Sequence, residues 1–331
     1  MKHIFLSSLI LIFHVCLTYG QNNPLRVEDI YNKLNIKVPM LLGENLISTG
    51  ANEFNAAFTK DMDEFYFSIR HRSDFFIILK CDIKNGEFQK PEIASFSGKY
   101  LDADPFISKD GSYLYFCSNR PTAENDTTYD WNIWRLERVK NKWHNITLLS
   151  FNTADKNEMY PSVAESGNIY FHSDLESEGK NLSFSGTNIY KSIYKNGNYE
   201  GYEKILPAST EEFPEWDPLI SPNEDYLIFT SPRPGGLGSG DMYICFKQQN
   251  NQWSEPINLG EKINSPGMDY CPSLSPDGKI LFFSSYLNSL NFNLFPDSYD
   301  DLIYKLNRPQ NGNGDIYFID SNIINSLRCK E

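Results

Sequence analysis

The sequence predicts an all-β protein: a five-bladed β-propeller of four-stranded antiparallel blades, with the ring closed by a strand from the N-terminal part of the chain. An aromatic strand ending in a small polar residue recurs five times. Its second aromatic residues are 49, 55, 58 and 54 residues apart, a period typical of propeller blades. The five strands end at Tyr66-Phe67-Ser68, Tyr115-Phe116-Cys117-Ser118, Tyr170-Phe171-His172-Ser173, Ile228-Phe229-Thr230-Ser231 and Phe282-Phe283-Ser284-Ser285.

Turn residues divide each repeat into four strands. The first strand carries an acidic residue, and in four repeats a proline follows it. A tight turn comes next, as in Lys109-Asp110-Gly111, where glycine supplies the positive φ that such hairpins require. The aromatic strand is therefore the second strand of each unit. The acids are Glu53, Asp104, Glu158, Asp217 and Asp269, and the prolines are Pro105, Pro161, Pro218 and Pro272.

The third strand of each repeat contains Asn or Asp, then Ile or Met, then Tyr or Trp, as in Asn188-Ile189-Tyr190. Repeat one has the weaker counterpart Asp74-Phe75-Phe76. The fourth strand is short and contains a proline in the stretch from Trp253 to Gly260. Because an edge strand has unpaired amides, proline is tolerated there. We therefore expect the fourth strand at the outer rim of each blade.

The segment Pro39–Gly43 reads as a fourth strand with no blade in front of it. The last repeat, conversely, has its third strand near residues 315–319 and then reaches the end of the sequence. We expect Pro39–Gly43 to complete the last blade, because closure protects sheet edges that would otherwise be exposed. At a constant offset of 217, Pro39–Gly43, Ser48 and Gly50 match Pro256–Gly260, Ser265 and Gly267.

Residues 1–20 are predicted to be a signal peptide. Lys2 and His3 precede the apolar run from Ile4 to Leu17, which is shorter than the roughly 20 residues that span a bilayer, and small residues favour cleavage after Gly20. Residues 21–37 form an N-terminal extension with one helical pattern, Val27 to Leu34, and residues 38–331 form a single propeller domain. We expect an exported protein, periplasmic or secreted, without a transmembrane span.

Composition argues against nucleic acid as a partner. The chain has 30 basic and 43 acidic side chains and a formal net charge of −13, so its surface repels phosphate backbones. Five cysteines follow the signal peptide at irregular spacing, which is not a disulfide framework. Cys329 is the cysteine expected to be exposed. Those expected to be buried in or beside strands are Cys81, Cys117, Cys245 and Cys271.

Repeats four and five resemble the WD-like repeat of the TolB-type β-propeller family. The resemblance covers roughly residues 38–320, and it implies an exported bacterial propeller. In TolB-like relatives such propellers are protein-binding modules of the cell envelope, often joined to a second domain, which we do not expect here. The resemblance rests on Asp217-Pro218, Ser221-Pro222, Ile228 to Arg233, Gly235-Gly236, Gly240 to Tyr243, and Pro272 to Gly278.

One face of the propeller is the predicted binding surface. In a four-stranded blade, the turn into strand one and the turn between strands two and three lie at the same end. The lengthened segments 121–129, 174–187 and 286–314 should therefore share a face with the five acids. Aromatic residues of these regions either stack on sugars or pack the insertions onto the blades. They are Tyr129, Trp131, Phe292, Phe295 and Tyr299.

Two interpretations of the recurring acids remain open. Inward carboxylates could hold a divalent cation in the central channel, because hard cations take several oxygen ligands. Alternatively, each acid bonds to backbone amides where its blade begins. A catalytic group is needed once and a folding device five times, so recurrence favours the structural interpretation. Apart from this cation, no cofactor is predicted.

Signatures of the common hydrolases are missing from the sequence. His71, His144 and His172 come from different repeats, without HxH or HExxH spacing, and there is no Gly-x-Ser-x-Gly motif. Sialidases are propellers with an arginine cluster, but the arginines here do not recur as such a cluster would. Arg120 and Arg233 do match each other, just after the aromatic strand, which indicates a repeat position.

The sequence therefore predicts a non-enzymatic exported propeller that binds a protein or peptide, with an envelope glycan as the second candidate partner. We expect a monomer. The alternative function is that of a carbohydrate-active enzyme, a lyase or glycoside hydrolase, in which inner-strand carboxylates act as general acid and base.

Overall fold

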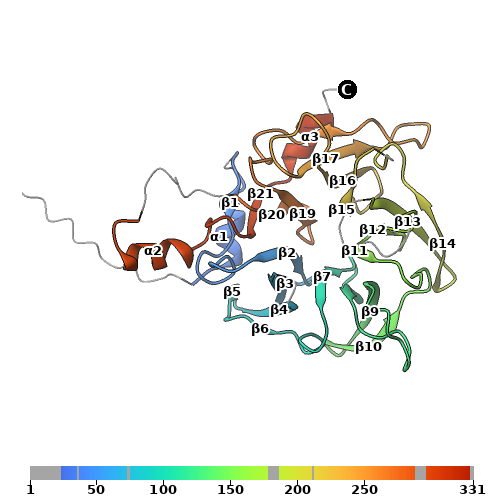
Figure 1. Ribbon diagram of the computed structural model, residues 1–331, viewed down its shortest axis with the longest axis horizontal. Helices are drawn as coiled ribbons and strands as arrows, with labels where there is room; N and C mark the ends of the chain where they lie inside the picture. The colour runs from blue at the N-terminus through green and yellow to red at the C-terminus, as the bar shows by residue number, and fades with distance from the viewer. Residues whose placement is uncertain are drawn as a thin grey trace, which may run out of the picture.

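The computed structural model describes residues 24–35, 37–72, 75–177, 186–210, 212–287 and 296–328. Five antiparallel sheets surround a common axis, with the first strand of each sheet near the centre of the disc (Figure 1). The predicted all-β, five-bladed propeller is confirmed. Each blade has four strand positions, and in blade one the outermost position is divided between two short strands.

The strands follow one another blade by blade along the chain. Blade one contains β2 (Glu53–Phe58), β3 (Glu64–His71), β4 (Phe75–Lys84), β5 (Glu87–Phe88) and β6 (Glu92–Ile93). Blade two contains β7 (Asp102–Ile107), β8 (Tyr113–Ser118), β9 (Asn132–Val139) and β10 (Lys142–Leu148). Blade three contains β11 (Glu158–Val163), β12 (Ile169–Ser173), β13 (Asn188–Lys195) and β14 (Asn198–Lys204). Blade four contains β15 (Trp216–Ile220), β16 (Tyr226–Ser231), β17 (Asp241–Phe246) and β18 (Ile257–Asn258), and blade five contains β19 (Asp269–Leu274), β20 (Ile280–Ser285) and β21 (Asp315–Asp320).

The ring is closed by β1 (Met40–Leu41), the outermost strand of blade five. β1 pairs antiparallel with β21, so that Met40 lies opposite Phe318 and Leu41 lies opposite Tyr317. The sheet order of blade five is accordingly β1-β21-β20-β19. The predicted role of Pro39–Gly43 is confirmed, and Figure 1 shows this early segment beside the last strand of the chain.

The loop after β1 contains one residue more than its counterpart in repeat four. Thr49 donates hydrogen bonds to Glu53 from its amide and its hydroxyl, as Ser265 does to Asp269. The predicted match of Ser48 with Ser265 is therefore wrong by one residue. Ser48 Oγ instead accepts the amide of Ile316 at 3.1 Å and donates to its carbonyl at 3.3 Å. This contact fastens the N-terminal segment to the last blade.

The polar residue after each second aromatic residue joins neighbouring blades. Every inner strand has a β-bulge at a residue with φ between 53° and 58°, and at four of the five junctions the amide of that residue donates to the polar side chain of the preceding blade. At the remaining junction, Cys271 N donates to Asp217 Oδ2 at 3.2 Å. The four pairs are Asn55 N with Ser284 Oγ (3.0 Å), Asp104 N with Ser68 Oγ (3.1 Å), Tyr160 N with Cys117 Sγ (3.1 Å), and Asp217 N with His172 Nδ1 (3.1 Å).

The core lies within and between the blades and is rich in aromatic residues. The second aromatic residue of every repeat is at most 2% exposed, which explains why the repeat retains a large ring there. Cys81, Cys117, Cys245 and Cys271 are buried free thiols, as predicted, and Cys329 lies outside the described residues. The five aromatic residues are Phe67, Phe116, Phe171, Phe229 and Phe283.

Three helices accompany the blades in the part of the chain that the structure describes. α1 (Val27–Tyr31) falls within the predicted helical pattern and buries Ile30 against blades one and five. α2 (Tyr299–Leu306) and α3 (Asn322–Arg328) were not predicted. α2 has no buried residue and extends away from the disc, whereas α3 packs against blades four and five (Figure 1). Within the described ranges, no helix has the length and apolar character needed to cross a membrane.

Candidate functional site

The five predicted acids occupy two different positions in the blades, so they do not form a single ring. Glu53, Glu158 and Asp269 begin their inner strands. Asp104 and Asp217 lie two residues further along, at the bulges, and Asp102 and Glu215 are the true counterparts of the first three. The prediction of five equivalent acids is therefore wrong. Repeats two and four each contain two acids, and the prediction took the one next to the proline. The acid three residues before the proline, Asp102 or Glu215, is the one that begins the blade, as Glu158 and Asp269 do.

The acids that begin the blades hold the preceding loop in place. Each accepts a hydrogen bond from the backbone amide four or five residues earlier. In blades two and four an arginine adds a buried ion pair, Arg120 with Asp102 and Arg233 with Glu215, both at 2.7 Å. This supports the structural interpretation of the recurring acids. The five bonds join Thr49 to Glu53, Gly98 to Asp102, Thr153 to Glu158, Thr210 to Glu215 and Ser265 to Asp269.

The bulge residues fill the centre of the ring. Tyr160 extends from blade three to blade five, where its hydroxyl donates to Pro272 O at 2.7 Å. Burial raises the pKa values of Asp104 and Asp217 above the usual carboxylate range, and the charge of Asp104 raises that of Asp217 further. Cys271 Sγ lies 3.5 Å from Asp217 Oδ2. Among the described residues, no three His, Cys, Asp or Glu side chains are arranged to hold a metal ion.

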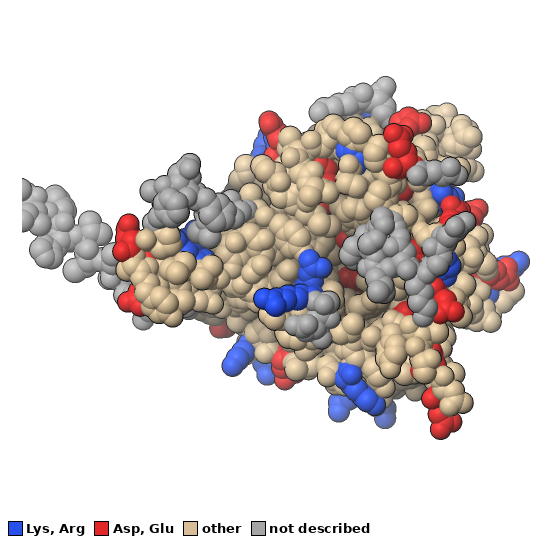
Figure 2. Space-filling view, viewed as in Figure 1, with Lys and Arg blue, Asp and Glu red and all other residues tan. Residues whose placement is uncertain are grey.

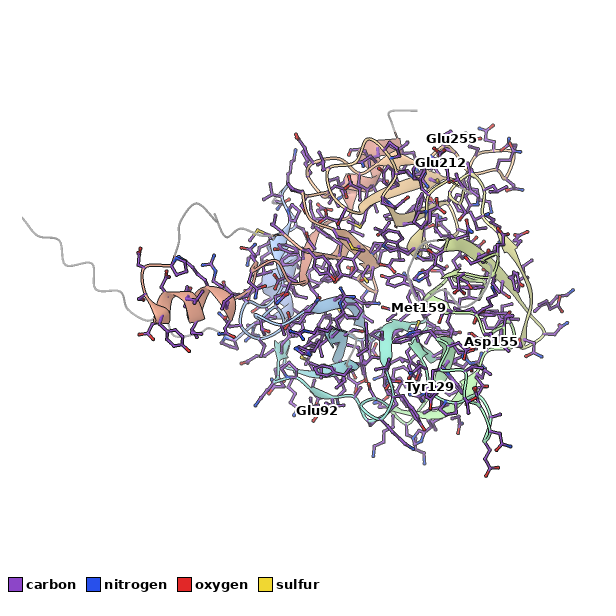
Figure 3. The ribbon with its side chains drawn as sticks, viewed as in Figure 1. Glu92, Tyr129, Asp155, Met159, Glu212 and Glu255 are labelled. Carbon is purple, nitrogen blue, oxygen red and sulfur yellow. The ribbon has the colours of Figure 1, made fainter. Side chains whose placement is uncertain are left out.

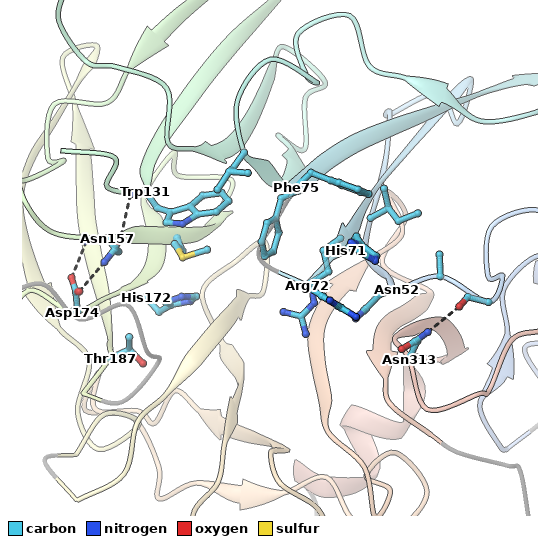
Figure 4. A pocket seen from close by; sticks show the side chains of 17 residues that line it. Asn52, His71, Arg72, Phe75, Trp131, Asn157, His172, Asp174, Thr187 and Asn313 are labelled. Atoms are coloured by element: carbon cyan, nitrogen blue, oxygen red, sulfur yellow. Dashed lines mark hydrogen bonds between the residues drawn. The ribbon is translucent and has the colours of Figure 1, made fainter. Parts of the chain in front are cut away.

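A cavity of about 910 Å³ lies at one mouth of this filled channel (Figure 4). It is lined by residues that lead into inner strands and by residues that end second strands, so it lies on the face that the sequence predicts. Its walls come from blades one to three and from the segment before β21. Figure 3 shows Met159, a lining residue, near the middle of the disc, whereas Glu92 and Glu255 lie at the rim.

One wall of the cavity is cationic. Arg70, His71 and Arg72 are consecutive at the end of β3 and all line the cavity. Arg70 donates a hydrogen bond to the hydroxyl of Tyr286, and its guanidinium carbon lies 5.7 Å from the centre of that ring and 6.0 Å from the centre of Phe76. Figure 2 shows basic side chains near the middle of this face. In a chain of net charge −13, this is a locally positive site.

The rest of the lining is largely apolar. Phe75 is 40% exposed, and Phe76 packs edge-on against Trp131 with ring centres 5.4 Å apart. Across the cavity from Phe75 and Arg72 lie His172 and Asp174 (Figure 4). Burial lowers the pKa of His172 to about 3, so the ring is neutral at physiological pH.

The aromatic residues predicted for this face have different locations. Trp131 lines the cavity, whereas Tyr129 and Tyr299 are each 74% exposed and lie elsewhere. Phe292 and Phe295 lie outside the described residues. Arg70, Arg72, Phe75, Phe76 and Met159 line the cavity and were not identified from the sequence as site residues. Phe75 and Phe76 had been aligned with the third-strand core. That prediction is wrong, because Ile77, Ile78 and Leu79 lie opposite Ile69, Ser68 and Phe67, as Asn132, Ile133 and Trp134 lie opposite Ser118, Cys117 and Phe116.

No protein-family model and no curated protein matches the chain. Solved structures similar to it include the putative TolB from Agrobacterium tumefaciens, with 16% identity, a TM-score of 0.47, and coverage of 71% of this chain and 70% of that one. TolB from Acinetobacter baumannii shares 14% identity with a TM-score of 0.45, covering 81% and 54%. Prolyl oligopeptidase B from Galerina marginata shares 14% identity with a TM-score of 0.42, covering 70% and 29%. The solved structures that this chain resembles thus include TolB proteins, as its repeat motifs predict.

Proposed function

We propose that this protein is a non-enzymatic exported propeller, periplasmic or secreted, that binds a protein or peptide partner in the cavity at the mouth of its channel. The observation that carries the proposal is that the recurring residues and the cavity residues are different sets. The recurring acids are used in contacts that build the blades. The cavity is lined instead by arginine and aromatic side chains that do not recur. Residues without counterparts in the other repeats are not needed to build the blades, so they are available to bind a ligand.

The carboxylates of the cavity do not suit glycoside hydrolysis. Such enzymes place two carboxyl groups about 5 to 9.5 Å apart across the scissile bond. Asp174 is the one acidic side chain among the described lining residues. Its two oxygens accept hydrogen bonds from the amide and the side chain of Asn157, at 2.8 and 2.9 Å. A group held in this way stabilises the lining, and the described lining residues include no second carboxylate.

Site-specific photo-crosslinking tests the proposal. A benzophenone amino acid is placed at Phe75 in the cavity, and in a control protein at Ile93, which is 55% exposed on the rim strand β6. Incubation with envelope extract followed by irradiation is expected to give a discrete crosslinked band from position 75 and none from position 93. Equal labelling from both positions contradicts the proposal. Turnover of a glycan by the purified protein, with or without divalent metal, would favour the carbohydrate-active alternative instead.

A further inference from the structure

The two arginines of the cavity differ from the arginines that build the blades. Arg120 and Arg233 each form an ion pair with a buried carboxylate. Among the described residues, no carboxylate forms an ion pair with Arg70 or Arg72, and Arg72 is exposed. The charge of Arg70 acts at longer range on the buried Asp104 and Asp217, whose pKa values it lowers. An arginine keeps its charge at any physiological pH and offers paired donors that match a carboxylate. The cavity therefore presents two cations to an anionic ligand.

Arg70 is already held in position. Its hydrogen bond to Tyr286 and its place between the rings of Tyr286 and Phe76 restrict the guanidinium group before any ligand arrives. Side-chain ordering is one of the costs of binding, so a group held in this way loses less freedom when it binds. Aromatic rings beside the positive charge also suit a ligand with an apolar part next to its charge.

The neutral polar side chains of the cavity are engaged in the fold. Asn52 Oδ1 accepts the amide of Gly314 at 3.2 Å, and Asn313 Nδ2 donates to Gly50 O at 2.9 Å. Sugar recognition requires many such groups to be available for hydroxyls. The arginines are better placed than these amides to contact a ligand, which favours a charged peptide over a glycan.

The floor of the cavity is closed. Met159 lines this cavity and Val163 lines the opposite mouth, and Tyr160 lies between them in the same strand, with its hydroxyl bonded across the ring to Pro272. A polypeptide therefore cannot thread from one face to the other. A polypeptide that enters this mouth must either turn back or end there. A chain that turns back must fit two segments through the opening, whereas a chain end fits only one.

We propose that the cavity captures the C-terminal end of a partner polypeptide. The terminal carboxylate binds Arg70 and Arg72, and the last apolar or aromatic side chain packs against Phe75, Phe76 and Trp131. This inference rests on the proposed function, because it specifies which part of a protein partner enters the site. The ligand chemistry is a free carboxylate beside an apolar side chain.

Paired peptide arrays provide the test. One array carries random hexapeptides attached through their N-termini with free C-terminal carboxylates, and the second carries the same sequences as C-terminal amides. The full chain is applied to both, as wild type, as Arg72→Gln and Arg72→Lys, and as Lys109→Gln. Lys109 is an exposed cation at the opposite mouth, so its replacement is a matched change of charge away from the site.

We expect the best binders on the acid array to bind at least about tenfold more weakly as amides, since one charged hydrogen-bonding pair is worth about a factor of ten. Arg72→Gln should remove that preference, Arg72→Lys should restore part of it, and Lys109→Gln should leave it intact. Thermal unfolding confirms that each variant is folded. An Arg70→Gln protein provides a second variant with the same expected loss.

Equal binding of acids and amides overturns the inference, and so does preferred binding of internal Asp or Glu peptides or of a uronic-acid oligosaccharide. If acids and amides bind equally but position 75 still crosslinks to a protein, the proposed function stands and only the carboxylate inference fails. If neither array binds and position 75 does not crosslink, both fail.

Discussion

The backbone amide of Asn55 in blade one donates a hydrogen bond to Ser284 Oγ in blade five, 3.0 Å away. The two residues are adjacent in the ring although 229 positions separate them in the chain. The same contact, with Ser68, Cys117 or His172 as acceptor, joins three other pairs of blades. One polar position of the repeat is therefore both a sequence marker and the joint between sectors.

Ser284→Ala should lower the free energy of unfolding by about 1 kcal/mol. The substitution leaves a buried amide at the closing joint without its acceptor, and the side chain it removes is fully buried. Urea unfolding followed by tryptophan fluorescence gives the value. Ser326→Ala on the exposed surface of α3 is the control and should have no measurable effect. Equal stability of the two variants would show that the joint contributes nothing.

Leu42→Ala should destabilise the protein by about 3 kcal/mol. Leu42 directly follows β1, is fully buried in the cluster shared by blades one and five, and its amide bonds to Ile316 O at 2.8 Å. Shortening it leaves a cavity where the ring closes. Leu237→Ala, at a residue that is 53% exposed, is the matched control. If both variants lose the same small amount, the N-terminal segment is not what holds the last blade.

Arg120→Gln and Arg72→Gln should separate structural from binding arginines. Arg120 is 8% exposed and neutralises the fully buried Asp102, so its loss should cost about 3 kcal/mol of folding free energy. Arg72 is exposed and has no carboxylate partner among the described residues, so its loss should change stability by less than about 0.5 kcal/mol. Differential scanning calorimetry of the two variants and the wild type measures the two losses of stability. A larger loss for Arg72→Gln would make that residue part of the scaffold.

Glu158→Gln should flatten the dependence of stability on pH. Burial, with the nearby charges of Asp174 and Asp130, raises the pKa of Glu158 to about 9, and its Oε2 has no hydrogen-bond partner among the described residues. Between its unfolded pKa near 4.5 and about 9, the folded state keeps a proton that the unfolded state has released. The contribution of this group to the free energy of unfolding is therefore fully present below pH 4.5. It falls as the pH rises, by up to about 1.4 kcal/mol per pH unit.

Urea unfolding at pH 5 and pH 8.5 measures this effect. The loss of stability between the two values should be smaller for Glu158→Gln than for the wild type. Gln248→Glu, an exchange of similar shape at an exposed residue just after β17, serves as the control and should not alter the difference. Parallel curves for wild type and Glu158→Gln would mean that Glu158 is ionised in the folded protein.

The fold could be predicted because the residues that build each blade recur in the sequence. Phe116 and Phe229 mark the same buried position in their blades, and the match of Pro39–Gly43 to repeat four revealed how the ring closes. The helices were harder to predict because they occur once. α2 has a capping serine, Ser298, whose hydroxyl accepts the amide of Asp301, but it lies inside an insertion that was treated as one loop.

The site could be predicted only in its location. The cavity lies on the face that strand order predicts, whereas Asp104 and Asp217 were assigned to the wrong position because they stand next to a proline, two residues after the acids that begin their blades. Arg72 has no counterpart in the other repeats, so a search for recurrence does not find it. Phe75 was aligned with the third-strand core, although the register places it before that core. In a repeat protein, the shared positions build the scaffold, and the positions without counterparts are the ones to examine for binding.

Hydrogen exchange with and without the captured partner tests the central claim most directly. We predict that binding protects the amides of residues 69–72 and 157–159, which line the cavity, and leaves residues 107–109 and 273–276 at the opposite mouth unchanged. Protection at the opposite mouth or along the rim, with none at residues 69–72, would contradict the claim that this cavity is where the protein binds.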